Sequence, residues 1–233
     1  MDSQIAYTYS EPLVHAEFLL DCMGTAHSNG ISNVLVTNGC VNTEASPVSL
    51  SPAEAILSFT DAANIDLKSF SKKTYSGILG GNLDTVLDFI RLAITLGVHT
   101  EITTLVVPDL NDDEKELMAI VEFIAGLSEK NHNVSIPWHL SAYHRDWKWD
   151  APPTNPAALT TLAKKARTIL PHVYTGNIAD EHNDTVCGQC GATLVKRQGY
   201  SIDAAGIRLP HQTQSPAFYN CAGCSTETPL RLN

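Results

Sequence analysis

Long apolar runs and an amino-terminal basic stretch are both missing from this sequence. No run of about 18 or more apolar residues occurs, and the first thirty residues contain neither Lys nor Arg. We therefore expect neither a membrane-spanning helix nor an export signal, and the expected location is the cytoplasm.

Positive charge is also scarce. The 233 residues include 15 Lys and Arg against 25 Asp and Glu, which gives a net charge of −10. Because duplex nucleic acid is held by basic side chains that neutralise its phosphates, nucleic acid is not an expected partner. Hydrophobic residues make up 43% and charged residues 17% of the chain, which excludes disorder and indicates a compact fold with a sizeable core.

Only six cysteines occur, and their spacing is uneven. Cys22 and Cys40 are isolated, and we expect them to be buried, small apolar side chains. The other four form two CxxC pairs with thirty residues between them: Cys187, Cys190, Cys221 and Cys224. Two such pairs supply the ligands of a closed tetrahedral site that suits zinc, or less often a single iron. Disulfides are disfavoured because cytosolic thiols stay reduced, so one structural metal site is predicted.

The order of the predicted elements indicates the fold class. Up to about residue 176, short β-branched runs alternate with longer helical patterns, which is typical of consecutive βα units and a parallel sheet. The expected strands cover residues 5–9, 33–37, 64–68, 99–107, 134–140 and 172–175, and the expected helices cover residues 13–23, 51–59, 83–96, 113–127 and 155–170. The sequence therefore predicts a partial parallel (β/α) barrel over residues 1–177.

The pattern changes from about residue 177, where helical periodicity ends and Gly, Thr and Cys become frequent. Residues 178–233 are predicted to form a small, β-rich, metal-binding tail that contains the four cysteines. Because about fifty residues bury little core on their own, we expect the metal to supply much of the stability of this tail.

Polar residues follow the predicted strands, at the edge where a parallel barrel holds its ligand. They are Ser10, Glu11, Thr37, Asn38, Asp66, Lys68, Asn111, Asp112, His139 and Ser141. Each has a plainer explanation when it is taken singly: Glu11 starts a helix, Asn38 makes a turn, and Asp66 pairs with Lys68. Their placement after consecutive strands favours a ligand site.

Glu101 and the tryptophans leave alternatives open. Glu101 shares a strand face with His99 and Thr103, so it points into the barrel either as a satisfied interior carboxylate or as a catalytic group. All three tryptophans fall within residues 138–149, among several basic side chains. We expect this segment to be a loop that closes over the ligand site, and a loop packed down for stability is the alternative.

Several of these segments, in this order, are similar to those of a known family. They are residues 5–12, 36–39, 65–68, 99–105, 108–112, 138–144 and 173–177, together with the two CxxC pairs. The sequence resembles the radical SAM enzymes of the AmmeMemoRadiSam system, which are relatives of the pyruvate formate-lyase activating enzymes. The similarity spans nearly the whole chain, and its motifs are specific only when taken together.

The resemblance implies a radical SAM barrel whose mouth holds a [4Fe-4S] cluster and S-adenosylmethionine. The implied reaction is reductive cleavage of that cofactor to a 5′-deoxyadenosyl radical, which abstracts a hydrogen atom. Memo-like and AMMECR-type proteins are the implied partners.

The resemblance also assigns cofactor-binding positions. In this sequence they are Ser10, Glu11, Thr37, Asn38, Asp66, Lys68 and His139. Ser10 and Glu11 match the segment that holds the methionyl amino group in the family, and Thr37 and Asn38 match a segment near the ribose. The last three match positions that contact the cofactor or order the site.

One motif of the family is absent. The family binds its cluster through CxxxCxxC, which does not occur here, and Cys22 and Cys40 lie too far apart to replace it. The motif would lie upstream of Ile5, where four residues remain. We therefore interpret the sequence as the carboxyl-terminal part of such an enzyme. Two other interpretations stay open: a non-catalytic interaction module on a degenerate barrel, and a barrel lyase or aldolase that uses Lys68.

Overall fold

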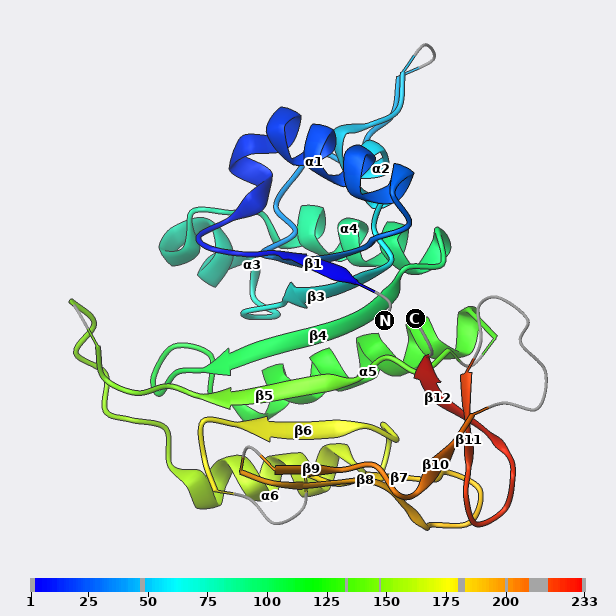
Figure 1. Ribbon diagram of the computed structural model, residues 1–233. Coiled ribbons are helices and arrows are strands. Elements are labelled where there is room, and N and C mark those ends of the chain that lie inside the picture. Colours follow the sequence, from blue (N-terminus) through cyan, green and yellow to red (C-terminus); the bar gives the residue numbers. More distant parts are fainter. Residues whose placement is uncertain are drawn as a thin grey trace.

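One sheet of six parallel strands organises most of the chain (Figure 1). The computed structural model describes residues 3–46, 49–132, 134–146, 148–179, 183–199, 201–209 and 218–231. The strands lie side by side in sequence order: β1 (Gln4–Tyr7), β2 (Ser32–Thr37), β3 (Ala62–Asp66), β4 (His99–Val106), β5 (Trp138–Ala142) and β6 (Val173–Gly176). The predicted partial parallel (β/α) barrel is confirmed.

The helices connect successive strands and cover one face of the sheet (Figure 1). They are the 3-10 turn η1 (Pro12–His15), α1 (Ala16–Ser28), α2 (Pro52–Leu57), α3 (Lys72–Thr74), the π turn η2 (Tyr75–Leu79), α4 (Leu83–Thr95), α5 (Glu114–Lys130) and α6 (Pro156–Ala166). Side-chain caps fix where several of them begin. Ser51 Oγ accepts the Glu54 amide at 3.0 Å, and Asp113 Oδ1 accepts the Glu116 amide at 2.9 Å. Among the described residues, no helix combines the length and apolarity needed to cross a membrane.

The two faces of the sheet differ in polarity, and β4 shows the pattern most clearly. Thr100, Ile102, Thr104 and Val106 are buried toward the helices. The alternate residues of β4 stay partly exposed on the other face, because successive side chains of a strand point to opposite sides. The predicted interior position of Glu101 is thereby confirmed, and the apolar core lies between the sheet and the helices.

The tail forms two small antiparallel sheets. The first contains β7 (Thr185–Val186), β8 (Thr193–Gln198) and β9 (Ser201–Asp203), and the second contains β10 (Ile207–Arg208), β11 (Phe218–Cys221) and β12 (Glu227–Arg231). Leu194, Val195, Cys187 and Cys221 form a separate small core there. Figure 1 shows β8 and β9 beside β6, on the face of the sheet opposite the helices. The division of the chain into two domains at residue 177 stays a prediction.

Three details of the sequence interpretation are wrong. Strand β3 ends at Asp66, so Lys68 lies in the loop that follows it. Trp138 does not belong to a surface loop, because it lies in β5 and is fully buried toward the helices. Cys40 is exposed and Cys22 is only half-buried, so neither is the buried apolar side chain expected.

The burial of Trp138 predicts a large stability cost for its replacement. Its indole donates a hydrogen bond to Thr104 Oγ1 at 3.0 Å inside the core. The substitution Trp138→Phe removes this bond and leaves a small void, so we expect the free energy of unfolding to fall by about 1.5 to 3 kcal/mol in urea titrations. Trp149→Phe is the control, because Trp149 is 44% exposed. Equal losses in the two variants would contradict this account.

Candidate functional site

Glu11 joins the ends of the first two strands. It lies between β1 and η1, and its carboxylate accepts hydrogen bonds from Thr37 Oγ1 at 2.6 Å and from the Asn38 amide at 2.8 Å. A third bond comes from the Leu13 amide at 3.2 Å, which caps η1. A carboxylate offers about four acceptor positions, so three donors leave one for a ligand. The structure thus brings Glu11, Thr37 and Asn38 together, whereas the Ser10 side chain is exposed and has no hydrogen bond among the described residues.

Asp66 and Lys68 form a second polar group, at the end of β3. Lys68 Nζ lies 2.8 Å from Asp66 Oδ2, and both side chains are partly exposed. The loop backbone is held by the Asn111 amide nitrogen, which donates to the carbonyls of Lys68 and Leu105. Because one of three ammonium protons is used by Asp66, Lys68 retains donors for an anionic group.

His139 is hydrogen-bonded to Glu101 on the face of the sheet opposite the helices. Its Nε2 is 2.8 Å from Glu101 Oε2, and His99 Nε2 is 3.4 Å from Glu101 Oε1. Burial by itself would raise the pKa of Glu101, but the hydrogen bonds from the two histidines outweigh it and lower the pKa below its ordinary range. Glu101 is therefore a satisfied interior carboxylate in this structure.

The strand register sets how these groups are spaced. Asp66 pairs with Thr103, and Thr103 pairs with His139 on the next strand. His139 in turn pairs with Tyr174 on β6. Neighbouring strands lie about 4.8 Å apart, so Asp66 and His139 are separated by roughly 10 Å across the open face of the sheet. A ligand that touches both must be extended along this face.

The segment after β5 is exposed over most of its described residues, and hydrogen bonds of Tyr143 and His144 anchor it. The Tyr143 hydroxyl donates to the Trp149 carbonyl at 2.8 Å, and the Tyr143 amide donates to Thr154 Oγ1 at 2.8 Å. His144 Nε2 lies 3.1 Å from the Asn177 carbonyl. Trp147, which belongs to the predicted lid, lies outside the described residues. The contacts that are described favour the packed-loop alternative.

The four tail cysteines converge on one point. All four sulfurs lie within 4.8 Å of one another, with Cys187 Sγ 3.7 Å from Cys224 Sγ and Cys190 Sγ 3.7 Å from Cys221 Sγ. A tetrahedral ion with bonds of about 2.3 Å to sulfur requires S···S separations of about 3.8 Å. The cluster thus has the dimensions of a mononuclear zinc or iron site, and the predicted CxxC/CxxC knuckle is confirmed.

The backbone of each knuckle suits thiolate binding. Gly191 and Ser225, each directly after the second cysteine of a pair, adopt left-handed conformations with φ of 71° and 61°. The Gly223 amide points at Cys221 Sγ at 3.3 Å. Hydrogen bonding with Thr226 lowers the pKa of Cys224 to about 6, so one thiolate forms readily at neutral pH.

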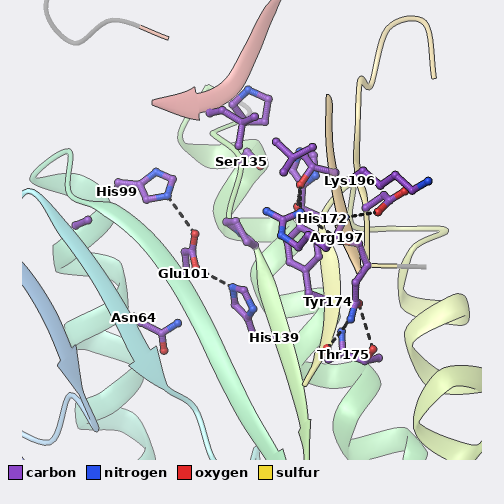
Figure 2. A pocket seen from close by; sticks show the side chains of 18 of the residues that line it. Asn64, His99, Glu101, Ser135, His139, His172, Tyr174, Thr175, Lys196 and Arg197 are labelled. Carbon is purple, nitrogen blue, oxygen red and sulfur yellow. Dashed lines mark hydrogen bonds and ion pairs between the residues drawn. The ribbon is translucent and has the colours of Figure 1, made fainter. Parts of the chain in front are cut away.

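A large cavity separates the sheet from the tail (Figure 2). Its volume is about 1590 Å³. One wall is formed by the first half of the strands and includes His99, Glu101 and His139, and the opposite wall includes Arg197 of β8. The Tyr174 ring lies between them, 5.4 Å from the His139 ring and 5.1 Å from the Arg197 guanidinium. Sequence patterns gave no indication of Arg197, because its position depends on how the tail folds back.

Comparisons with known proteins agree with this architecture. No family model matches the chain. The chain is 35% identical over 214 residues to the uncharacterized protein MJ0808 of Methanocaldococcus jannaschii, covering 90% of this chain and 59% of that protein. It is 27% identical over 141 residues to pyruvate formate-lyase 1-activating enzyme of Escherichia coli K12, covering 60% of this chain and 54% of the enzyme. The chain thus spans little more than half the length of these relatives.

Solved structures of such proteins are similar to this chain in fold. A domain of pyruvate-formate lyase-activating enzyme from Bacteroides vulgatus superposes with a TM-score of 0.61 at 19% identity, over 75% of this chain and 99% of that one. A radical SAM methyltransferase from Sphaerobacter thermophilus gives a TM-score of 0.52 at 13% identity, over 75% of this chain and 51% of that one. Pyruvate formate-lyase activating enzymes are therefore among the homologues of the chain, and radical SAM enzymes are its structural neighbours.

The four-cysteine cluster predicts the metal content. We expect about one metal per chain after anaerobic reconstitution with iron and sulfide, because the four tail cysteines gather at a single mononuclear site. The substitution Cys221→Ser should abolish tight metal binding, whereas Cys40→Ser should not. Iron counting and electron paramagnetic resonance measure the outcome. About four irons per chain with a cluster signal would refute the assignment.

The environment of Glu101 predicts a pH dependence of stability. The lowered pKa in the folded state means that the unfolded chain takes up the proton first as pH falls, so the contribution of Glu101 is present above about pH 4.5 and is lost below it. In urea titrations between about pH 6 and pH 3, the variant Glu101→Gln should therefore lose stability less steeply than the wild type. The control Glu122→Gln, at an exposed position of α5, should keep the wild-type slope. Parallel curves for Glu101→Gln and the wild type would contradict the assignment.

Proposed function

We propose that this chain supplies the S-adenosylmethionine site of a radical SAM enzyme of the activating-enzyme type. The observation that carries the proposal is the polar edge built by Glu11, Asn38 and Lys68 at the carboxyl ends of three adjacent strands. This is the edge at which parallel barrels hold ligands. The homology to activating enzymes supports the same assignment.

The groups at this edge fit the two ends of an amino-acid moiety. Glu11 has an acceptor position left for the methionyl ammonium, and Lys68 has donors left for the methionyl carboxylate. Asn38 Oδ1 accepts the Cys40 amide at 2.8 Å, which leaves the Asn38 side-chain NH₂ available to a ribose hydroxyl. When bound, the cofactor supplies the source of a hydrogen-abstracting radical. His139 is two strands away from Asp66, where it orders Glu101.

The residues of this chain do not fit a [4Fe-4S] cluster at that edge. Such a cluster needs three cysteines close together, and the CxxxCxxC motif does not occur in the sequence. Four of the six cysteines are already gathered in the tail. In our proposal the cluster ligands come from outside these 233 residues, and we derive no catalytic step from this chain alone.

The finer family assignment is also a proposal. We propose membership of the AmmeMemoRadiSam system, with Memo-like and AMMECR-type proteins as partners, on the basis of the segments shared with that family. The same assignment proposes a cytoplasmic enzyme whose tail holds one structural zinc or iron.

Cofactor binding by calorimetry tests the proposed function. We expect the metal-loaded chain to bind S-adenosylmethionine at a single saturable site. Lys68→Met should weaken this binding at least about tenfold, because a charge-assisted bond to the carboxylate is lost. Lys72→Met is the matched control, since Lys72 is a nearby exposed lysine that also pairs with an aspartate, Asp84, at 2.7 Å.

The alternatives give different results in this experiment. A folded, metal-loaded chain that does not bind the cofactor would refute the proposal and favour the non-catalytic interaction module. A Lys68 adduct trapped with borohydride and a carbonyl compound would favour the lyase or aldolase instead.

A further inference from the structure

Arg197 brings a positive charge to the cavity, and the described residues offer it no ion-pair partner. The side chain is half-buried. Asp184, the nearest acidic residue in sequence on the same wall, accepts the Arg197 backbone amide at 2.7 Å. Half-buried guanidinium groups are normally paired, because an uncompensated charge away from water is unfavourable.

The guanidinium is held in a fixed orientation. Nη1 donates to Thr185 Oγ1 at 2.7 Å and to the Asn183 carbonyl at 3.2 Å, and the plane of the group lies over the Tyr174 ring. Tyr174 is itself anchored, because its hydroxyl lies 2.8 Å from Thr185 Oγ1. These contacts leave Nη2 and Nε without a hydrogen bond among the described residues. Nη2 and Nε lie on one edge of the guanidinium, so they can donate in parallel to two oxygens of a carboxylate or a phosphate.

Other cavity groups are consistent with an anionic ligand. Three carboxylates also line the cavity, and each accepts a hydrogen bond: Glu101 from His139 and His99, Asp61 from the Asn33 amide, and Asp184 from the Arg197 amide. Burial, followed by the nearby charge of Arg197, lowers the pKa of His172, which also lines the cavity. The Ser135 hydroxyl lines the cavity, is buried, and has no hydrogen-bond partner among the described residues.

The metal site stabilises the β7–β8 hairpin that carries Arg197. The knuckle of Cys187 and Cys190 forms the turn between β7 and β8, and Thr185 of β7 pairs with Val195 of β8. A metal bound by the four cysteines therefore fixes the hairpin that places Arg197 over Tyr174. Without the metal, the tail loses the bond that ties its two sheets together.

We propose that the cavity between the amino-terminal half of the sheet and the four-cysteine tail binds a small organic anion, with Arg197 pairing with its carboxylate or phosphate. This site is separate from the edge at which we place S-adenosylmethionine. Its occupant is a molecule of metabolite size, because a cavity of about 1590 Å³ exceeds the needs of an inorganic ion.

Calorimetric titration with two probes tests this proposal. Inorganic phosphate and succinate are each titrated into the zinc-loaded full chain in the absence of S-adenosylmethionine, so that the result does not depend on the proposed function. We expect saturable binding of at least one probe, and the stronger of the two identifies the anionic group that the site prefers. Arg197→Gln should weaken binding at least about tenfold. Arg208→Gln, a nearby exposed arginine outside the cavity lining, should leave it unchanged.

A chemical measurement on the wild type tests the role of Arg197 without a variant that could misfold. Phenylglyoxal modifies accessible guanidinium groups, and we expect the bound probe to protect Arg197 but not Arg208, as read by mass spectrometry. Metal content of Arg197→Gln, measured in parallel, reports whether the tail is intact. The proposal is overturned if neither probe binds saturably up to about 20 mM, or if neither the substitution nor the protection distinguishes Arg197 from Arg208.

Discussion

The structure depends on the alternation of side chains along parallel strands. Every second residue of β2 to β6 is buried against helices, and the residues between them point to the open face of the sheet. The face against the helices carries most of the apolar side chains, together with the buried Asn33, Thr37, Thr100 and Thr104, and the ionisable side chains of these strands lie on the other face. Glu101, His139 and Tyr174 lie there for this reason, and so does the cavity that they line. Asn64 and Asp66 of β3 share that face, because they are two positions apart on the strand.

Much of the barrel could be predicted because its signals are local. The β-branched runs and the 3.6-residue periodicity of residues 83–96 are properties of short segments, and α4 occupies Leu83–Thr95. Strand ends were less predictable. Lys68 continues an apolar alternation beyond β3, but the hydrogen bond from its amide to the Tyr75 hydroxyl, at 3.1 Å, takes the place of a sheet bond. The π turn at Tyr75–Leu79 has no sequence pattern that marks it.

The candidate sites also contain residues that could be predicted from the sequence and one that could not. The four cysteines could be predicted from spacing alone, since CxxC pairs bring sulfurs together wherever they occur. Residues Glu11 and Asn38 could be placed because strand ends meet at one edge of a parallel sheet. Arg197 could not, because its partner Tyr174 is twenty-three positions away and the contact exists only once β8 lies against β6. Trp138 was assigned to a loop because a tryptophan with polar neighbours is as typical of a loop as of a strand that is buried on one face only.

The hydrogen bonds of Trp138 form a relay with a fixed direction. An indole N–H can only donate, so the Thr104 oxygen must accept from it, and the hydroxyl proton is then directed to the Leu67 carbonyl at 2.8 Å. The relay runs from β5 across β4 to the last residue before Lys68. Since none of its members can reverse roles, the backbone that carries Lys68 is oriented by an aromatic ring two strands away, which is fully buried between the sheet and the helices.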